Sequence, residues 1–272
     1  MTEGISVNFL METEILAVDS KATLEEACSA MYIGRLKRLM VRDEEEYTGI
    51  ITATDILDAL KRIGDRSFFH QNVVEWMTPD IATISYDKNV KDLTRMMRDM
   101  DITGIPVIDE NDKIVGIVTE RDVITYDIIW NEIDNISLDA GNSVVLKVDE
   151  GHTATAEFTF WQIVDRLIAG KKRELVLVDD DKMVGFLTKM DLIRTITTHS
   201  KEFKSSPDFF QTHMINMDDV RFYVPAKLPN TVGRFRRLMN VRGISSIPVL
   251  TGAYPSYIVN QESLIIAHSL WS

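Results

Sequence analysis

A pattern of apolar and polar positions recurs along the chain at nearly constant intervals. Each copy has glycine, two apolar residues, threonine, two variable residues and aspartate, as in GIITATD (49–55), GIVTERD (116–122) and GFLTKMD (185–191). A fourth copy, YIVNQES (257–263), keeps the apolar pair and changes the rest. The copies begin at residues 49, 116, 185 and 257, so we infer four repeats with a period of about seventy residues.

The segments before each motif also match one another. Each gives an apolar strand, a polar turn and then the motif strand, at 38–49, 105–116, 175–185 and 247–257. Asp, Asn and Gly favour the tight turns that such hairpins need. Further upstream, METEI (11–15) matches MTPDI (77–81). We therefore expect a β-hairpin in every repeat.

Apolar residues at helical spacing predict one helix before each hairpin and another after each motif. Three stripes carry this prediction: Val90, Leu93, Met97 and Met100; Ile56, Leu60 and Ile63, with Gly64 as the stop; and Phe160, Ile163, Val164 and Leu167. Each repeat then has the order strand, helix, strand, strand, helix. A small sheet with helices on one face leaves apolar surface exposed, and pairing of repeats buries it.

We predict an α/β (α+β) fold of four tandem repeats, each a small three-stranded sheet with two helices. Polar stretches at 64–72, 135–143 and 199–210 separate the repeats. The predicted boundaries are 1–65, 66–134, 135–200 and 201–272, with the degenerate motif in the last repeat.

Composition and charge narrow the class of protein. No apolar run is long enough for a membrane span, and the acidic N-terminal segment is not a secretory signal. The single cysteine, Cys28, follows the helical spacing of Leu24, Ala27 and Met31, so we expect a buried thiol and a cytoplasmic protein. A formal net charge of −12 disfavours nucleic acid as the main partner.

The threonine and aspartate of the motif allow two interpretations. They fit a helix N-cap followed by an acidic third residue. Aspartate reaches the cap amide less well than glutamate, which favours a second role for it. A helix N-terminus also suits phosphate, and a carboxylate can accept both ribose hydroxyls. Spacing alone leaves both interpretations open.

Several chemistries have no support in the sequence. The five histidines lack metal-ligand spacing, and there is neither a phosphate-binding P-loop nor a nucleophile elbow. The acidic run 179–181 is most simply a solvated turn. We therefore expect no enzyme activity, no metal and no catalytic cofactor.

Four such units, with their Pro-Val strands and motifs in register, resemble CBS domains over essentially the whole chain. The resemblance implies two paired (Bateman) modules and adenosine ligands in clefts between repeats. In the family, the motif aspartate usually holds ribose, threonine contacts phosphate, and apolar residues surround adenine. Four-repeat chains of this kind are similar to the gamma subunit of AMP-activated kinase and to stand-alone archaeal CBS proteins.

The resemblance implies a set of nucleotide-binding residues: Thr52, Asp55, Ile81, Thr83, Ile105, Pro106, Thr119, Arg121, Asp122, Thr188, Lys189 and Asp191. In the fourth repeat Asn260 and Ser263 replace Thr and Asp, and we expect that site to be empty or weak. Aligned by spacing, Leu39 and Arg38 stand where the second repeat has Pro106 and Ile105, and Val176 replaces the proline in the third.

Basic clusters at 34–38, 170–173 and 233–237 are either solvated helix surface or phosphate ligands from a neighbouring repeat. The leading hypothesis is a sensor of AMP, ADP or ATP that reports to an unknown regulated protein, with no nucleic-acid or membrane partner and with a homodimer as a further assembly. An S-adenosylmethionine-type ligand, a ligand-free scaffold and a nucleotide-hydrolysing enzyme are the alternatives.

Overall fold

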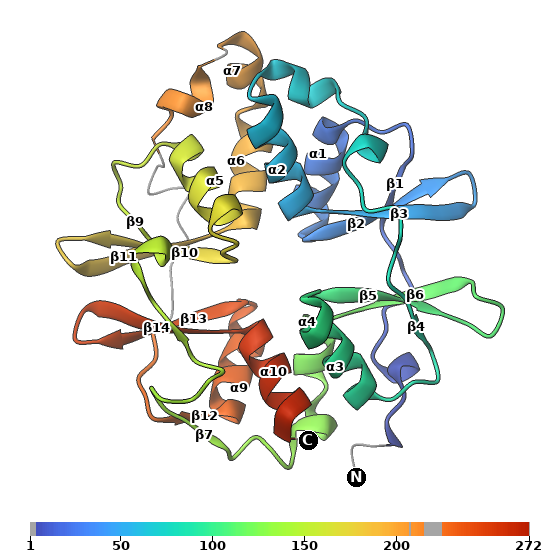
Figure 1. Ribbon diagram of the computed structural model, residues 1–272, viewed down its shortest axis with the longest axis vertical. Helices are drawn as coiled ribbons and strands as arrows, with labels where there is room; N and C mark the ends of the chain where they lie inside the picture. Colours follow the sequence, from blue (N-terminus) through green and yellow to red (C-terminus); the bar gives the residue numbers. More distant parts are fainter. Residues whose placement is uncertain (1–3, 207, 215–224, 272) are drawn as a thin grey trace. The chain divides into compact units, whose positions relative to one another are not determined.

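The computed structural model describes residues 4–206, 208–214 and 225–271, and the chain divides into two compact units (Figure 1). Unit 1 comprises Met1–Ile15, Ala82–Val148 and Val224–Ser272, and unit 2 comprises Leu16–Ile81 and Asp149–Tyr223. Unit 2 therefore holds the first and third repeats, and unit 1 holds the second and fourth. The predicted repeat boundaries stay a prediction.

Both repeats of unit 2 have the predicted order of elements. The first contains β1 (Ala17–Asp19), α1 (Leu24–Gly34), β2 (Arg38–Asp43), β3 (Glu46–Thr52) and α2 (Ala53–Ile63). The third contains β9 (Thr153–Ala154), α5 (Phe160–Ala169), β10 (Glu174–Asp179), β11 (Lys182–Thr188) and α6 (Lys189–Thr198). In each sheet the first strand runs parallel to the middle one, which pairs antiparallel with the motif strand.

Unit 1 repeats this design with one change in a sheet. The second repeat contains β4 (Ile84–Ser85), α3 (Val90–Met100), β5 (Gly104–Ile108), β6 (Ile114–Thr119) and α4 (Glu120–Thr125). The fourth contains α9 (Val232–Arg242), β13 (Ser246–Thr251), β14 (Tyr254–Asn260) and α10 (Gln261–Trp271). Here β8 (Leu146–Lys147) pairs with β14, while β7 (Ser137–Leu138) pairs with β12 (Asn230–Thr231).

Short helices connect these elements. Within the part of the chain that the structure describes, the 3-10 helices include η2 (Val7–Phe9), η3 (Arg66–His70), η4 (Val73–Glu75), η5 (Asp127–Trp130) and η6 (Glu150–His152). After α6, two short helices, α7 (Ser200–Ser205) and α8 (Phe209–Thr212), place Phe203 and Phe210 in the core of unit 2. These two aromatic rings lie 4.0 Å apart.

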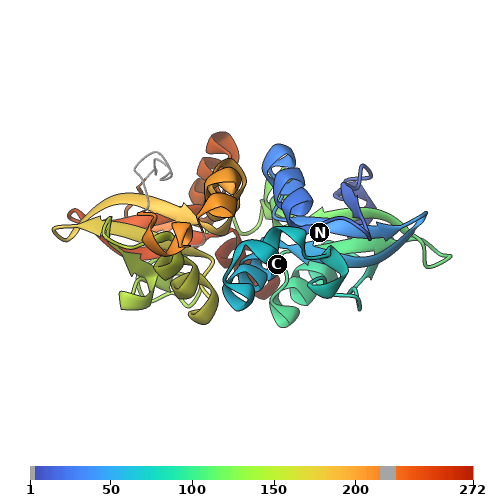
Figure 2. The same ribbon diagram turned by 90° about the horizontal axis from the view of Figure 1, so that it is seen from above.

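Helix packing joins the two repeats inside each unit. In unit 2, α1 packs against α6, and α2 packs against α5 and α6. The β2–β3 and β10–β11 hairpins point away from each other at opposite ends of that unit (Figure 2). In unit 1, α10 packs against α3 and α4. The apolar stripes of these helices bury one continuous core per unit, which is why the repeats need partners.

The predicted core residues are largely confirmed. Cys28 and its three helical neighbours are buried, as are all four members of the stripe on α5. Val90, Leu93 and Met97 are buried on α3, but Met100 was expected beside them and is exposed. It is the last residue of α3, and the chain turns at Asp101, which has a left-handed backbone conformation.

Two linking segments each form an isolated β-bridge with a motif strand. Glu12 pairs with Ile117 of β6 in unit 1, and Thr78 pairs with Ile50 of β3 in unit 2. Two backbone hydrogen bonds of 2.8 to 3.0 Å hold each pair. The chain passes between the units shortly after each pairing, at 15–16 and at 81–82. The segments METEI and MTPDI therefore share a structural role, since each pairs one residue with the edge of a motif strand.

Within the described residues, none of the helices combines the length and apolar character needed to cross a membrane.

Candidate functional site

Three corners of the same geometry lie where a motif strand becomes a helix. In the second repeat, Oδ2 of Asp122 accepts hydrogen bonds from the Thr119 amide and the Thr119 hydroxyl, both at 2.7 Å. The pair Thr52–Asp55 repeats these bonds at 2.7 Å each, and Thr188–Asp191 repeats them at 2.8 and 2.7 Å. The three intact motifs therefore build one local structure.

We expected aspartate to reach the cap amide poorly, and this expectation is wrong. In all three corners the carboxylate reaches back to the amide of the capping threonine. The motif strand remains extended at threonine, with ψ between 164 and 166°, and this conformation brings the cap amide toward the third helical residue. The capping interpretation is confirmed, so any ligand contact is an additional role.

The helix N-termini offer less to a phosphate than the sequence suggests. The first amide of α2, from Ala53, donates to the Lys37 carbonyl, and the first amide of α4, from Glu120, donates to Thr103. The Asp55 amide donates to the Thr52 hydroxyl at 3.3 Å. The threonine hydroxyl proton is directed at aspartate, so it cannot donate to a phosphate while that bond holds. Charged side chains would have to bind an anion here.

Unit 2 brings two corners close together. Lys189, the first residue of α6, donates from Nζ to the hydroxyl of Thr54 in the first turn of α2, at 2.8 Å. Burial raises the pKa of Asp55, although its bonds to Thr52 and the positive charge of Lys189 oppose this rise. A half-buried carboxylate whose pKa is raised lacks enough donors to offset its lost hydration.

Unit 1 contains most residues assigned to the second-repeat site. Ile105 and Pro106 are buried on β5, directly across from Val118 and Ile117 of the motif strand. Thr83 immediately precedes β4, which runs beside β5. Arg121 is exposed on α4, and its guanidinium lies close to Gly243 at the end of α9. Ile81 belongs to unit 2.

Strand register corrects the alignment of the first repeat. Arg38 lies across from Thr52, just as Gly104 lies across from Thr119. Leu39 therefore corresponds to Ile105, and Met40 corresponds to Pro106. The alignment by spacing was wrong by one residue because the first hairpin is one residue shorter between these positions. Arg38 is a buried side chain opposite the motif threonine, rather than part of the predicted adenine wall.

The fourth corner is a helix cap of a different chemistry. Oδ1 of Asn260 accepts from the Ser263 amide at 2.9 Å and from the Ser263 hydroxyl at 3.1 Å. The Asn260 amide donates to the Ser263 hydroxyl at 3.3 Å. Both residues are buried. The corner thus keeps its capping function without a carboxylate.

One basic cluster forms a buried ion pair. Arg236 donates through two nitrogens to both carboxylate oxygens of Asp134, at 3.0 and 3.1 Å, and through a third to Asp127 at 2.6 Å. Arg236 is only 3% exposed. Neither solvated surface nor a phosphate ligand describes this residue. Arg237 also contacts Asp134, so the pair joins α9 to the segment after η5.

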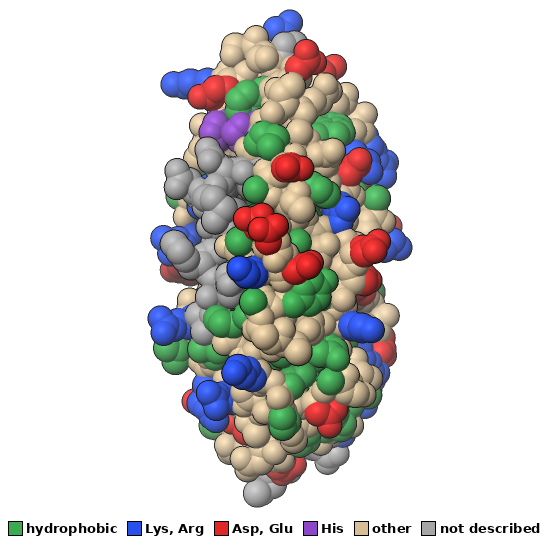
Figure 3. All heavy atoms as spheres, turned by 90° about the vertical axis from the view of Figure 1, so that its left-hand side faces the viewer, with side chains coloured by type: hydrophobic (Ala, Val, Ile, Leu, Met, Phe, Trp, Pro, Cys, Tyr) green, Lys and Arg blue, Asp and Glu red, His purple; other side chains and the backbone are tan. Residues whose placement is uncertain are grey.

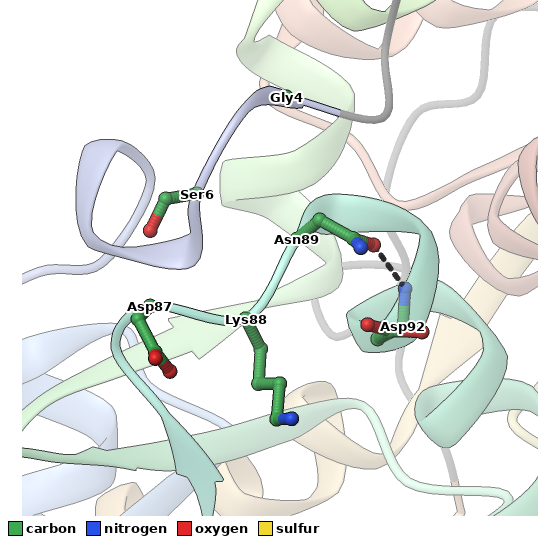
Figure 4. Close-up of a pocket in the computed structure, with 6 residues that line it drawn as sticks. All are labelled: Gly4, Ser6, Asp87, Lys88, Asn89 and Asp92. Carbon is green, nitrogen blue, oxygen red and sulfur yellow. Dashed lines mark hydrogen bonds between the residues drawn. The ribbon is translucent and has the colours of Figure 1, made fainter.

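A shallow polar hollow lies away from the motif corners, at the start of α3. It is lined by Gly4, Ser6, Asp87, Lys88, Asn89 and Asp92 (Figure 4). The Asn89 side chain caps α3 by accepting from the Asp92 amide at 2.8 Å. Its lining contains none of the predicted site residues, and no apolar surface there would hold a base.

Charge is mixed on the face shown in Figure 3, where acidic and basic side chains alternate with apolar ones and no broad basic surface is visible.

Among the described residues, His, Cys, Asp and Glu form no group that fits a metal ion. Lys189–Thr54 and Arg236–Asp134 were not predicted. They join residues 135 and 102 positions apart, and a single sequence carries no local signal for such contacts.

Comparison with known proteins finds CBS domains in the first two repeats. The CBS domain model matches residues 6–62 and 73–128. The crystal structure of protein MJ1225 from Methanocaldococcus jannaschii, described as a proposed archaeal homologue of g-AMPK, superposes with a TM-score of 0.83 at 17% identity, covering 96% of this chain and 99% of that one. In sequence, MJ1225 is 30% identical over 124 residues, which are 42% of this chain and 44% of that protein.

A homoserine O-acetyltransferase from Methanosalsum zhilinae is 28% identical over 121 residues, 44% of this chain and 23% of the enzyme. The chain thus spans less than half the length of these curated relatives. The first two repeats thus match the CBS domain model, and the same helices and hairpins recur in the third and fourth repeats.

Proposed function

We propose that the protein is a non-catalytic regulatory module that binds adenine nucleotides (AMP, ADP or ATP) at its motif corners and reports their presence to a partner protein. The half-buried carboxylate of Asp55 carries this proposal, because it lies beside a second motif whose Lys189 supplies positive charge. One corner thus combines an acceptor for sugar hydroxyls with a cation for phosphate.

The ribose would bind to the motif aspartate. Both capping bonds of Thr52 go to Oδ2 of Asp55, so the proposal assigns the ribose hydroxyls to Oδ1. A carboxylate in a partly dehydrated setting gains most from added hydroxyl donors, because they favour its charged form. The cap and the ribose contact use different oxygens, so the two roles are compatible.

The phosphates would bind to side chains. Lys189 in unit 2 and Arg121 in unit 1 each stand in the first turn of a motif helix, where the helix dipole also favours an anion. In a chain with a formal net charge of −12, such local cations are needed to attract a nucleotide. The apolar pair Ile105 and Pro106, with Thr83, would form the adenine wall within unit 1.

An S-adenosylmethionine-type ligand is the second candidate. The threonine hydroxyls direct their protons to aspartate, and the first helical amides are already paired in α2 and α4. These bonds favour a ligand without phosphate. Such a ligand would still use the motif aspartates and would not depend on Lys189.

The regulatory role is supported by relatives in which the matched region is one part of a larger protein. In the homoserine O-acetyltransferase it accounts for 23% of the protein. A signal requires that the partner distinguish the nucleotide-bound form from the free form. The partner is a regulated protein, and a homodimer is a further assembly for this chain.

Thermal unfolding with added ligands tests the proposal. AMP, ADP or ATP at millimolar concentration should raise the melting temperature by mass action on the folded state. A rise with S-adenosylmethionine alone would select the second candidate. Unchanged melting with all four ligands would leave a ligand-free scaffold as the better account.

A further inference from the structure

In two of the motifs, the glycine at the first position lies against a methionine side chain. A β-carbon built on Gly49 would lie 2.2 Å from Sδ of Met77, and 2.9 Å from both Cγ and Cε of the same residue. A β-carbon on Gly116 would lie 2.8 Å from Sδ of Met11 and 2.9 Å from the backbone oxygen of Glu12. Contacts this short require the neighbouring atoms to move, which at Gly49 means the flexible Met77 side chain and at Gly116 also a backbone oxygen.

These glycines are required for space and not for backbone freedom. The glycines with positive φ are Gly64, Gly243 and Gly252 among the described residues. Gly49 and Gly116 lie in strands β3 and β6, each directly after an irregularity in the strand register. Each methionine is half-buried and is followed at once by the residue that pairs with the motif strand, Thr78 or Glu12. In both places the methionine packs on the motif glycine, and the residue after the methionine is hydrogen-bonded to the same motif strand.

We propose that Met77 and Met11 are latch residues, which hold the segments linking the two units against the motif strands. The latch at Met77 precedes Thr78, which pairs with Ile50 two residues before Thr52 of the first corner. In this respect the inference rests on the proposed function, which assigns the ribose to Asp55 of that corner. A latched motif strand presents the corner in one position, so less conformational entropy is lost when the ligand binds.

The fourth repeat departs from this arrangement. Tyr257 occupies the position of the motif glycine and pairs with Lys147 of β8. Neither methionine nor glycine is present there, and the corner that follows has Ser263 in place of aspartate. The fourth repeat thus has neither the latch nor the carboxylate.

A double-mutant cycle on the full-length chain tests the latch. Gly49→Ala should displace Met77 and increase the exchange rate of the Thr78 and Ile50 amides by at least about tenfold, with a lower melting temperature. Met77→Ala should release the linker without a clash. Because the three atoms nearest the added methyl all belong to Met77, Gly49→Ala/Met77→Ala should be no less stable than Met77→Ala alone. Gly4→Ala, which meets no atom within 4 Å, is the control.

For Gly116 and Met11, the same double-mutant cycle should give a different result. In Gly116→Ala/Met11→Ala the Glu12 oxygen remains 2.9 Å from the new methyl, so the double variant should stay less stable than Met11→Ala. Additive effects at Gly49 and Met77, or unchanged exchange of Thr78, would overturn the latch.

Nucleotide titration of Met77→Ala separates the latch from a simple packing role. Affinity for AMP should fall severalfold at a temperature where the variant is fully folded, and unchanged affinity would overturn the positioning role. If wild-type protein binds no nucleotide, the proposed function fails, whereas the exchange results still decide whether the latch exists.

Discussion

Lys189 and Thr54 join two motif helices through one hydrogen bond of 2.8 Å, although 135 residues separate them in the sequence. The bond places the ammonium group of the third repeat at the first turn of α2, which begins after the first motif. Two corners of unit 2 therefore share one cation. A phosphate bound there would replace the Thr54 hydroxyl as the acceptor.

Replacing Lys189 with methionine should weaken ATP binding and leave folding nearly unchanged. The substitution keeps the apolar stem and removes the charge, and a partly exposed polar contact contributes little to stability. We expect roughly a tenfold loss of affinity, or about 1.4 kcal/mol, measured by calorimetric titration. Lys182→Met at the exposed hairpin is the matched control, and equal ATP affinity in both variants would contradict a phosphate role for Lys189.

Removal of the Arg236 guanidinium should strongly destabilise the protein. Arg236→Met leaves the partly buried Asp134 without its bidentate partner, and breaking one side of a buried ion pair costs roughly 3–5 kcal/mol. Urea unfolding measures the loss. Arg234→Met, on the exposed side of the same helix, should unfold like wild type. Similar midpoints for the two variants would show that the ion pair adds no stability.

Acid should destabilise the protein through His268. This histidine is fully buried on α10, 3.3 Å from the Thr94 hydroxyl, and burial lowers its pKa to about 4. Below pH 6.5 the unfolded chain binds a proton that the folded chain excludes. The contribution of His268 to stability therefore falls as pH decreases from about 6.5 to 4, by roughly 3 kcal/mol in total, and is constant below that range.

His268→Gln should flatten this pH dependence, because the amide can still bond to Thr94 and does not titrate. Urea midpoints at a series of pH values between 4 and 7 provide the comparison. The exposed His70 serves as the control position, since His70→Gln should keep the wild-type slope. A wild-type slope in His268→Gln would refute the assignment.

The repeats, the helices and the three intact corners could be predicted because each is encoded locally. Val90, Leu93 and Met97 mark one face of α3, and threonine with aspartate marks the start of α2. What the sequence did not reveal depends on long-range packing. The Asp134–Arg236 pair joins separate repeats, and strand register shifted the match of Leu39 because a hairpin lost one residue.

The capping distances were also beyond sequence reasoning. The reach of Asp55 to the Thr52 amide follows from the extended backbone at threonine, and residue type alone suggested the opposite. The structure thus removes one argument for a ligand, namely that aspartate caps poorly, and adds another in the raised pKa of Asp55. A substitution that keeps the cap and removes the charge separates the two roles.

Calorimetric titration of AMP into wild-type protein and the Asp122→Asn variant tests the central claim most directly. Asparagine keeps an oxygen for the Thr119 amide, so the melting temperature without ligand should stay close to wild type. Loss of a charged acceptor for the ribose hydroxyls should weaken binding by roughly 30-fold or more, about 2 kcal/mol. Equal affinity in the two proteins, with Asp122→Asn less stable in the absence of AMP, would instead mean that the aspartate serves only as a helix cap.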